Sequence, residues 1–257
     1  MAMLKRSLLV FLLIPIFVVT ASAQTDWNGF YAGGNVGAAL GRSTANTSTV
    51  FTGSDYFVAS SVAQIESAGL QKLRANAFTG GLEAGINGQA GSSIFGGEFD
   101  YESLRMSDSQ SVTIAYPCCT TTNFTIDQSF KTNWLLTARP RFGHAIGSAL
   151  LYATGGLAVT KVDYQAQFSD TFAGASEGAF VNKAKYGWVG GFGIAFRGSD
   201  QHFSVKAEYL YTDFGRLTMT SSNLTAFTPP TSYPANEFTH TMALHAHVIR
   251  AGVDYHW

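Results

Sequence analysis

Alternation of apolar and polar side chains is the dominant pattern of this chain. In the segment 203–211 the odd-numbered residues are apolar, and Lys206 and Glu208 stand between them. The segment 249–257 alternates in the same way, with Arg250 at an intervening position. Successive side chains of a β-strand point to opposite faces, so a period of two predicts strands with one apolar face and one charged face.

Six further segments extend this pattern along the chain. Two of them alternate clearly, and in the other four glycine takes many of the inward positions. The first two are 95–102 and 134–142, and the other four are 30–40, 78–89, 150–160 and 186–197. Together the eight segments predict an all-β protein, an eight-stranded antiparallel up-and-down barrel.

The connections between the segments alternate in length. Around Gly91, Gly147 and 198–200 they are as short as a hairpin turn. The long connections are predicted over roughly 42–74, 107–128, 165–183 and 217–239. In an up-and-down sheet this alternation places all long loops at one end. Bacterial outer-membrane barrels have short periplasmic turns and long extracellular loops, so both ends of the mature chain are predicted on the periplasmic side.

The first 23 residues are predicted to be a secretory signal peptide that is removed, which leaves 24–257 as the barrel domain. Lys5 and Arg6 precede an uninterrupted apolar stretch, and residues 21–23 have the small side chains that signal peptidase requires. An N-terminal membrane anchor is the alternative, but the apolar stretch is short for a spanning helix.

Alternation alone does not decide which face of the barrel looks outward. A secreted lipocalin-type barrel, apolar inside and polar outside, is therefore an alternative to a transmembrane barrel. Asymmetric loops and aromatic residues near the strand ends favour the transmembrane barrel, because interfacial girdles are aromatic. The aromatic residues assigned to these girdles are Trp27, Phe30, Tyr31, Tyr255 and Trp257.

Spanning strands must close on themselves, because lipid offers no hydrogen-bond partner to a free strand edge. An eight-stranded barrel has an interior just wide enough for side chains to fill it. Six acidic and four basic residues have the parity of the inward face, and we predict that they pair across neighbouring strands as a filled polar core rather than an ion-selective lining. This interior set is Glu83, Glu98, Asp100, Glu102, Arg139, Arg141, Lys206, Glu208, Arg250 and Asp254.

Composition and cysteine content exclude several classes of function. The chain of 257 residues has 13% charged residues and a formal charge of -1, which argues against nucleic-acid binding, where a basic face is expected. Cys118 and Cys119 cannot form a disulfide framework or a four-cysteine zinc site. They are adjacent in the second long loop, either as an incidental pair or, in an oxidising compartment, as part of a disulfide.

Histidines are the candidate residues for a metal site or for a catalytic base. His245 and His247 share one strand face, but no Asp, Glu or Cys flanks them at a recognised ligand spacing, so no metal and no cofactor are predicted. His240 with a nearby serine resembles the Ser-His pair of outer-membrane enzymes that process lipid A; the candidate serines are Ser221, Ser222 and Ser232. Such sites are defined by geometry and serines are abundant in these loops, so no catalytic residue is predicted.

Six strings of residues resemble the alphaproteobacterial outer-membrane β-barrel family of porin-like surface antigens. They follow the order found in that family and cover essentially the mature chain. The strings are DWNGFYAGGN at 26–35, GGLEAG at 80–85, WLLTAR at 134–139, LYATGG at 151–156, KAEYLY at 206–211 and HVIRAGVDY at 247–255. The resemblance implies an OmpA-like eight-stranded barrel with exposed loops and no catalytic residues.

The resemblance also implies insertion by the outer-membrane assembly machinery, which reads a C-terminal strand that ends in an aromatic residue. Tyr255 and Trp257 match this requirement, although phenylalanine is more frequent at the last position. The expected surroundings are outer-membrane lipid and lipopolysaccharide in a Gram-negative bacterium. The predicted function is structural and surface-interacting, with narrow porin-like solute passage as an additional expectation, and the alternatives are a lipid A-processing enzyme and a secreted ligand-binding barrel.

Overall fold

The computed structural model describes residues 25–257 apart from 54–55, so the predicted signal peptide, 1–23, lies outside the described residues. One helix and eleven strands follow one another along this part of the chain. They are β1 (Gly29–Thr49), α1 (Ala59–Gly69), β2 (Gln71–Ala90), β3 (Ser93–Leu104), β4 (Ser107–Ala115), β5 (Asn123–Ile146), β6 (Ala149–Asp170), β7 (Ser176–Arg197), β8 (Phe203–Ser221), β9 (Thr225–Ala226), β10 (Thr231–Ser232) and β11 (Phe238–His256).

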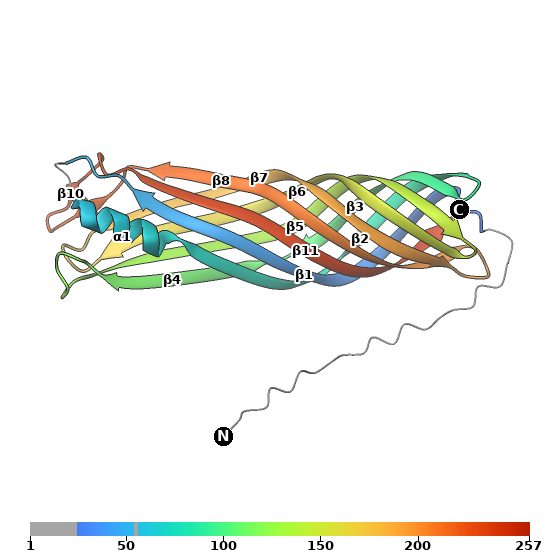
Figure 1. Cartoon of the computed structure of the whole chain (residues 1–257), viewed down its shortest axis with the longest axis horizontal. Helices are drawn as coiled ribbons and strands as arrows, with labels where there is room; N and C mark the ends of the chain where they lie inside the picture. Colours follow the sequence, from blue (N-terminus) through green and yellow to red (C-terminus); the bar gives the residue numbers. More distant parts are fainter. Residues whose placement is uncertain (1–24, 54–55) are drawn as a thin grey trace, which may run out of the picture.

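The strands form a closed antiparallel ring, which Figure 1 shows as a long cylinder. From β1 the ring passes through β2, β3, β5, β6, β7, β8 and β11, and β11 pairs again with β1. β3 and β4 both pair with β5 and act as one interrupted strand, so the ring contains eight strands. The predicted eight-stranded antiparallel barrel is confirmed.

Two kinds of connection mark the two ends of the cylinder. At one end, here called the turn end, Gly91 and Gly147 begin two-residue hairpins with positive φ angles of 61° and 59°, which glycine adopts without strain. Trp257 also lies at the turn end, where its backbone N–H donates to the carbonyl of Phe30 at 3.1 Å. The other end, here called the crown, comprises α1, β9, β10 and the connections around them.

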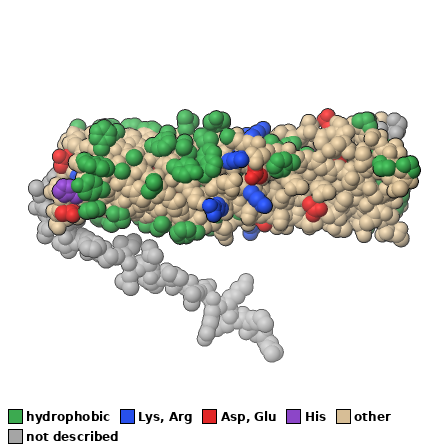
Figure 2. Space-filling view, turned by 180° about the vertical axis from the view of Figure 1, so that it is seen from behind, with side chains coloured by type: hydrophobic (Ala, Val, Ile, Leu, Met, Phe, Trp, Pro, Cys, Tyr) green, Lys and Arg blue, Asp and Glu red, His purple; other side chains and the backbone are tan. Residues whose placement is uncertain are grey.

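An apolar band covers the outer wall of the half that ends in the short turns, as Figure 2 shows. Its side chains are strongly exposed; Phe78, Leu82 and Leu157, for example, are 74%, 73% and 70% exposed. A soluble lipocalin-type barrel would instead keep such side chains inside. The outward apolar face therefore fits a barrel that meets lipid.

Beyond this band the apolar side chains of the strands face inward instead of outward. On β6 the apolar residue Leu157 faces outward, whereas Tyr164 and Phe168, nearer the crown, are fully buried inside. On β11 Val253 faces outward and Leu244 is buried. The barrel is therefore apolar outside along one half and apolar inside along the other, as expected where the outer wall passes from lipid into water.

The predicted long loops are wrong in extent, because the strands continue into them. β1 runs to Thr49 and β2 begins at Gln71, so the first connection is shorter than predicted and contains α1. The second predicted loop is mostly a hairpin of β4 with β5. A transmembrane strand needs about 9–11 residues, whereas β5 has 24, so the cylinder continues well beyond the apolar band.

Two of the predicted girdle residues are also wrong. Trp27 and Tyr31 are each only 1% exposed and lie inside the barrel, whereas Phe30 and Trp257 are 63% and 70% exposed. Tyr31 has the odd-numbered parity of the inward face of β1, which it shares with Asn35. The aromatic character of Tyr31 suggested a lipid interface, but its parity determines its direction.

The crown is held together by a second apolar cluster. Ile65 and Ala68 of α1 pack there with Phe124, Phe168 and further aromatic residues from other strands. α1 has 11 residues, and in the described part of the chain no helix is long and apolar enough to cross a membrane.

Candidate functional site

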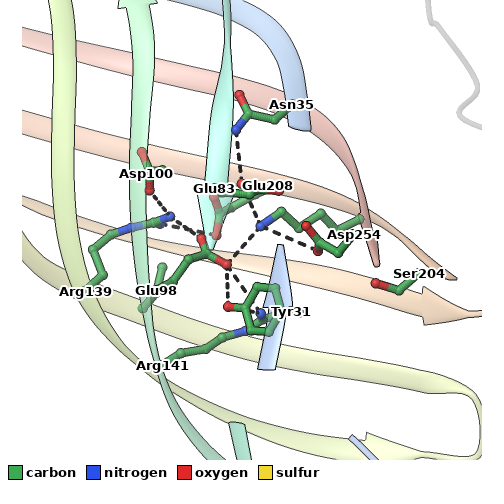
Figure 3. Close-up of polar contacts among 12 residues, drawn as sticks. Tyr31, Asn35, Glu83, Glu98, Asp100, Arg139, Arg141, Ser204, Glu208 and Asp254 are labelled. Atoms are coloured by element: carbon green, nitrogen blue, oxygen red, sulfur yellow. Dashed lines mark hydrogen bonds and ion pairs between the residues drawn. The ribbon is translucent and has the colours of Figure 1, made fainter. Parts of the chain in front are cut away.

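The ten charged residues of the predicted interior set all lie buried inside the barrel, and we call them the charge network. Figure 3 shows the part of the network around Glu98. They come from β2, β3, β5, β8 and β11, because the inward parity of each strand places one or more charges at the same region of the interior. In every ion pair of the network the two side chains are at most 3% exposed.

Glu98 on β3 is the centre of the network. Its carboxylate accepts from Arg139 Nη2 at 2.5 Å and from Lys206 Nζ at 2.9 Å. Arg141 Nη1 lies 3.4 Å from Glu98 Oε2, and the hydroxyl of Tyr31 donates to the same oxygen at 2.7 Å. One carboxylate therefore connects side chains from four strands of the ring.

Two arginines link the remaining acids across the interior. Arg250 on β11 pairs with Glu208 on β8 at 2.6 Å and lies 3.3 Å from Asp100 and 3.5 Å from Glu102 on β3. Arg139 on β5 pairs with Asp100 at 2.8 Å and with Glu208 at 3.2 Å. Arg139–Glu98 and Arg250–Glu208 thus join neighbouring strands, as expected for the interior set, and both arginines also reach strands that are not their neighbours.

Lys206 holds the part of the network nearer the turn end. Its Nζ lies 2.9 Å from Glu83 Oε2 and 3.9 Å from Asp254 Oδ2. The side-chain amide of Asn35 donates to the same Glu83 oxygen at 3.0 Å. Buried ions are tolerated only when opposite charges and hydrogen bonds replace their lost hydration, and here every cation has at least one carboxylate partner.

Aromatic side chains complete the packing around Arg141, and sequence reasoning did not find them. The guanidinium of Arg141 lies 3.6 Å from the ring centroid of Tyr152 and donates to the hydroxyl of Tyr31 at 3.0 Å. A Cβ at Gly85 or Gly193 would come within 2.4 Å of the Tyr31 or Tyr152 ring, respectively. Glycine at these two strand positions therefore makes room for the two rings.

Apolar layers fill the interior on both sides of the charge network. Towards the turn end the layer contains Trp27, Ile94, Leu150 and Ala195 among other residues. Towards the crown the larger layer contains Leu73, Leu104, Phe130, Phe214 and Leu244 among others, all at most 2% exposed. The barrel is thus packed with side chains along its length, as the diameter of an eight-stranded ring permits.

The serine and histidine candidates do not form a nucleophile–base pair. His240 Nδ1 is hydrogen-bonded with Thr47 Oγ1 at 2.8 Å, and His240 Nε2 lies 3.2 Å from Glu177 Oε1. Ser221 donates its hydroxyl to the same Glu177 oxygen rather than to His240. Ser222 and Ser232 are exposed, and neither is hydrogen-bonded to His240 in the described part of the chain. A catalytic pair requires the base to accept from the nucleophile.

The metal-binding candidates lie on the outer wall. His247 Nδ1 is hydrogen-bonded with the hydroxyl of Tyr209 at 2.6 Å, and the rings of His245 and His247 are 6.4 Å apart. Among residues 25–53 and 56–257, no group of three His, Cys, Asp or Glu side chains is arranged to hold a metal ion.

Cys118 and Cys119 have free thiols, with their sulfur atoms 2.7 Å apart, at the tip of the β4–β5 hairpin.

Comparison with known proteins places the chain in a family. A family model described as outer membrane protein beta-barrel domain matches residues 9–256. The 31 kDa outer-membrane immunogenic proteins of Brucella melitensis biotype 1 and Brucella suis biovar 1 are similar to this chain. Each is 26% identical over 232 residues, which cover 90% of this chain and 83% of the relative.

Two solved barrels show how far this likeness extends at low sequence identity. Neisserial surface protein A is 12% identical with a TM-score of 0.36, and covers 89% of this chain and 97% of its own. The outer membrane protease OmpT from Escherichia coli is 9% identical with a TM-score of 0.42, over 92% and 99% of the two chains. These values carry no functional argument. The family match over nearly the whole chain shows that the protein belongs to the outer membrane protein beta-barrel domain family, as a surface-antigen-like barrel of the Gram-negative outer membrane.

Proposed function

We propose that this protein is a closed, non-conducting barrel whose role is structural and which carries its crown at the cell surface. The observation that supports this most directly is the continuous filling of the interior. The charge network has side chains at most 3% exposed in its ion pairs, and apolar layers lie on both sides of it. A porin, in contrast, keeps a polar, water-filled interior.

The crown is a suitable surface for interaction because its connections are fixed to one another. Asp170, at the end of β6, accepts from the hydroxyls of Tyr56 and Tyr116 at 2.5 and 2.9 Å. Its other carboxylate oxygen accepts from the backbone N–H groups of Ala173 and Ala175 at 3.2 and 2.9 Å. Three connections therefore meet at one carboxylate. The Brucella relatives are named immunogenic outer-membrane proteins, which is consistent with display of such a surface.

Conductance across planar bilayers tests this proposal. We expect the wild-type protein to give no steady current steps, because its interior is filled. The charge network alone does not close the barrel, because apolar layers lie on both sides of it. The double variant Arg139→Ala/Arg250→Ala removes two guanidinium groups that cross the interior, and we expect it to give no steady current steps either. Steady, concentration-dependent steps from the wild type would instead support narrow solute passage.

A separate measurement addresses the lipid A-processing alternative. Purified protein is added to outer-membrane vesicles, and lipid A is then analysed by mass spectrometry. We expect an unchanged mass, because the hydroxyl of Ser221 is directed to Glu177 and not to His240. A new lipid A mass that disappears in His240→Ala would overturn the non-enzymatic proposal.

A further inference from the structure

Basic side chains outside the charge network gather in one zone at mid-length. Of the Lys and Arg residues that follow residue 23, four belong to the charge network and Arg197 lies at the turn end. Figure 2 shows Lys and Arg side chains gathered where the apolar half ends. The remaining basic residues form what we call the basic belt: Arg42, Lys72, Arg74, Arg105, Lys131, Lys161, Lys183, Lys185 and Arg216.

The basic belt follows the edge of the apolar band around the barrel. On β2 the exposed residue Phe78 is four positions from Arg74, and on β6 the exposed residue Leu157 is four positions from Lys161. A strand rises about 3.3 Å per residue, so these cations stand roughly 13 Å along the strand from Phe78 and Leu157, and on β6 the outward residue Val159 is nearer still. This is the level at which the charged groups of a lipid leaflet meet its hydrocarbon.

The cations of the basic belt form no close ion pair in the described part of the chain, although Asp163 is the direct partner of Lys131 in the register of β5 with β6. In the described part of the chain, no carboxylate oxygen lies within 4.0 Å of any of the nine, because all ion pairs at that distance are in the interior. The contacts that they do make are with backbone carbonyls. Arg42 Nη1 donates to Gly41 at 3.0 Å, and Lys185 Nζ donates to Arg216 at 2.6 Å.

Arg42 and Arg74 form the sharpest feature of the basic belt. They are direct partners in the register of β1 with β2, and both point outward. Like charges placed directly opposite repel each other, unless an anion lies between them. Two adjacent guanidinium groups can bind a phosphate with their planar sets of donors. Asp108 on β4 accepts from the backbone N–H of Arg74 at 2.7 Å and forms no ion pair with its guanidinium.

A polar groove continues from the basic belt towards the crown. It has a volume of about 570 Å³, lies beside α1 and is lined by Arg216, Thr44, Thr241 and Glu66 among others. Hydroxyl and carboxylate groups of this kind are hydrogen-bond partners for sugars. A phosphorylated glycolipid thus fits this wall better than a simple phospholipid, because it offers phosphate to the belt and sugar to the groove.

We propose that the basic belt is a binding site for the phosphate groups of lipid A, with Arg42 and Arg74 as one phosphate-binding pair. The inference takes the crown to be extracellular, so that the belt lies in the outer leaflet. It is independent of the proposed absence of conductance, since all belt residues lie outside the charge network.

Native mass spectrometry of the detergent-solubilised protein tests this site with bisphosphorylated lipid A, dephosphorylated lipid A and phosphatidylglycerol. The test variant is Arg42→Gln/Arg74→Gln. One basic side chain at an anionic surface contributes about a factor of five to affinity, so we expect the variant to bind bisphosphorylated lipid A about 30-fold more weakly. Wild type and variant should bind dephosphorylated lipid A equally.

The matched control is Arg197→Gln, which removes a positive charge at the turn end and should leave lipid A binding unchanged. Heat-modifiable gel migration verifies that each variant is folded. Equal binding of bisphosphorylated lipid A by wild type and double variant would overturn the proposal. So would equal competition by phosphatidylglycerol, because it would show a general attraction for anionic lipid instead of a lipid A site.

Discussion

At the scale of single residues, Glu98 has more basic partners than any other acid of the charge network. Arg139, Arg141, Lys206 and Arg250 all lie within 3.5 Å of its carboxylate. The side chain therefore offsets the desolvation of several buried cations at once. Loss of one member of a buried ion pair leaves an unpaired charge in a medium that solvates it poorly.

We expect Glu98→Ala to destabilise the folded barrel by about 3–5 kcal/mol, because the four cations lose their shared partner. The measurement is urea unfolding in lipid vesicles, followed by heat-modifiable gel migration. Glu237→Ala changes an exposed acid of the crown and should shift stability by less than about 0.5 kcal/mol. An equal, small effect of both substitutions would contradict the importance of the charge network for the fold.

Much of the interior could be predicted from parity alone. Alternation with apolar neighbours predicts an inward direction for the ten charged residues, and the structure buries all ten. The cross-barrel contacts could not be predicted, since the pairing of Arg250 with Asp100 depends on how the ring closes and not on sequence neighbours. The aromatic side chain of Tyr31 is typical of a lipid interface, but its position in the alternation of β1 directs it inward.

At the scale of elements, a long strand such as β6 has apolar side chains on its outer face within the band and on its inner face beyond it. The predicted strands ended where the outward apolar positions ended, and the following residues were interpreted as loops. The period of two in fact continues, with polar residues outside and apolar residues such as Tyr164 and Phe168 inside. The change of sense looks like the end of a strand when only outward apolar positions are counted, and this accounts for the error in loop length.

The apolar band should not tolerate an outward charge. Leu82 on β2 is 73% exposed within the band, so we expect Leu82→Arg to destabilise the barrel in lipid by up to about 2–4 kcal/mol, depending on its depth. Ser111→Arg places the same side chain on the outer wall of β4, beyond the band, and should have little effect. Urea unfolding of both variants in vesicles provides the comparison. If Leu82→Arg were as stable as Ser111→Arg, the band would not be the lipid-facing surface.

The crown depends on the carboxylate of Asp170. Burial, and then the hydrogen bond to Asp170, raise the pKa of Tyr56 above its ordinary range; burial and the negative charge of Asp170 do the same for the pKa of Tyr116. Both hydroxyls therefore remain donors, and each hydrogen bond to a charged group contributes about 1.5–3 kcal/mol. We expect Asp170→Ala to loosen the three connections that meet there.

Limited proteolysis of intact cells measures this loosening as faster cleavage near Tyr56. Asp127→Ala, which removes another acid from the same end of the barrel, should leave the rate unchanged. In the wild type the contribution of the two tyrosines is present below the ordinary tyrosine pKa of about 10 and is lost as the pH rises above it. Unchanged cleavage of Asp170→Ala would show that the aromatic packing alone holds the crown.

At the scale of the whole molecule, the two ends of the cylinder should face different compartments. Cys118 is exposed at the tip of the β4–β5 hairpin. After mild reduction of intact cells, we expect a membrane-impermeant maleimide to label it. In a cysteine-free background, Ser148→Cys in the β5–β6 turn should be labelled only after the outer membrane is permeabilised. Labelling of Ser148→Cys on intact cells would invert the predicted orientation.

The overall architecture was the most predictable level, because eight alternating segments joined by short and long connections leave few arrangements other than a closed ring. The length of the cylinder was not predictable in the same way. It depends on strand pairing beyond the membrane, where the outer wall has the polar composition of an ordinary loop.

Closure of the ring has a consequence for how the protein is made. β1 pairs with β11 along its length, from Tyr31 opposite His256 to Thr49 opposite Phe238. The free backbone groups of β1, the first strand made, therefore find their hydrogen-bond partners on β11 only after the last strand has been made. Contacts so distant in sequence form slowly, and waiting strands aggregate readily. We therefore expect the newly exported chain to need protection from aggregation until β1 and β11 have paired.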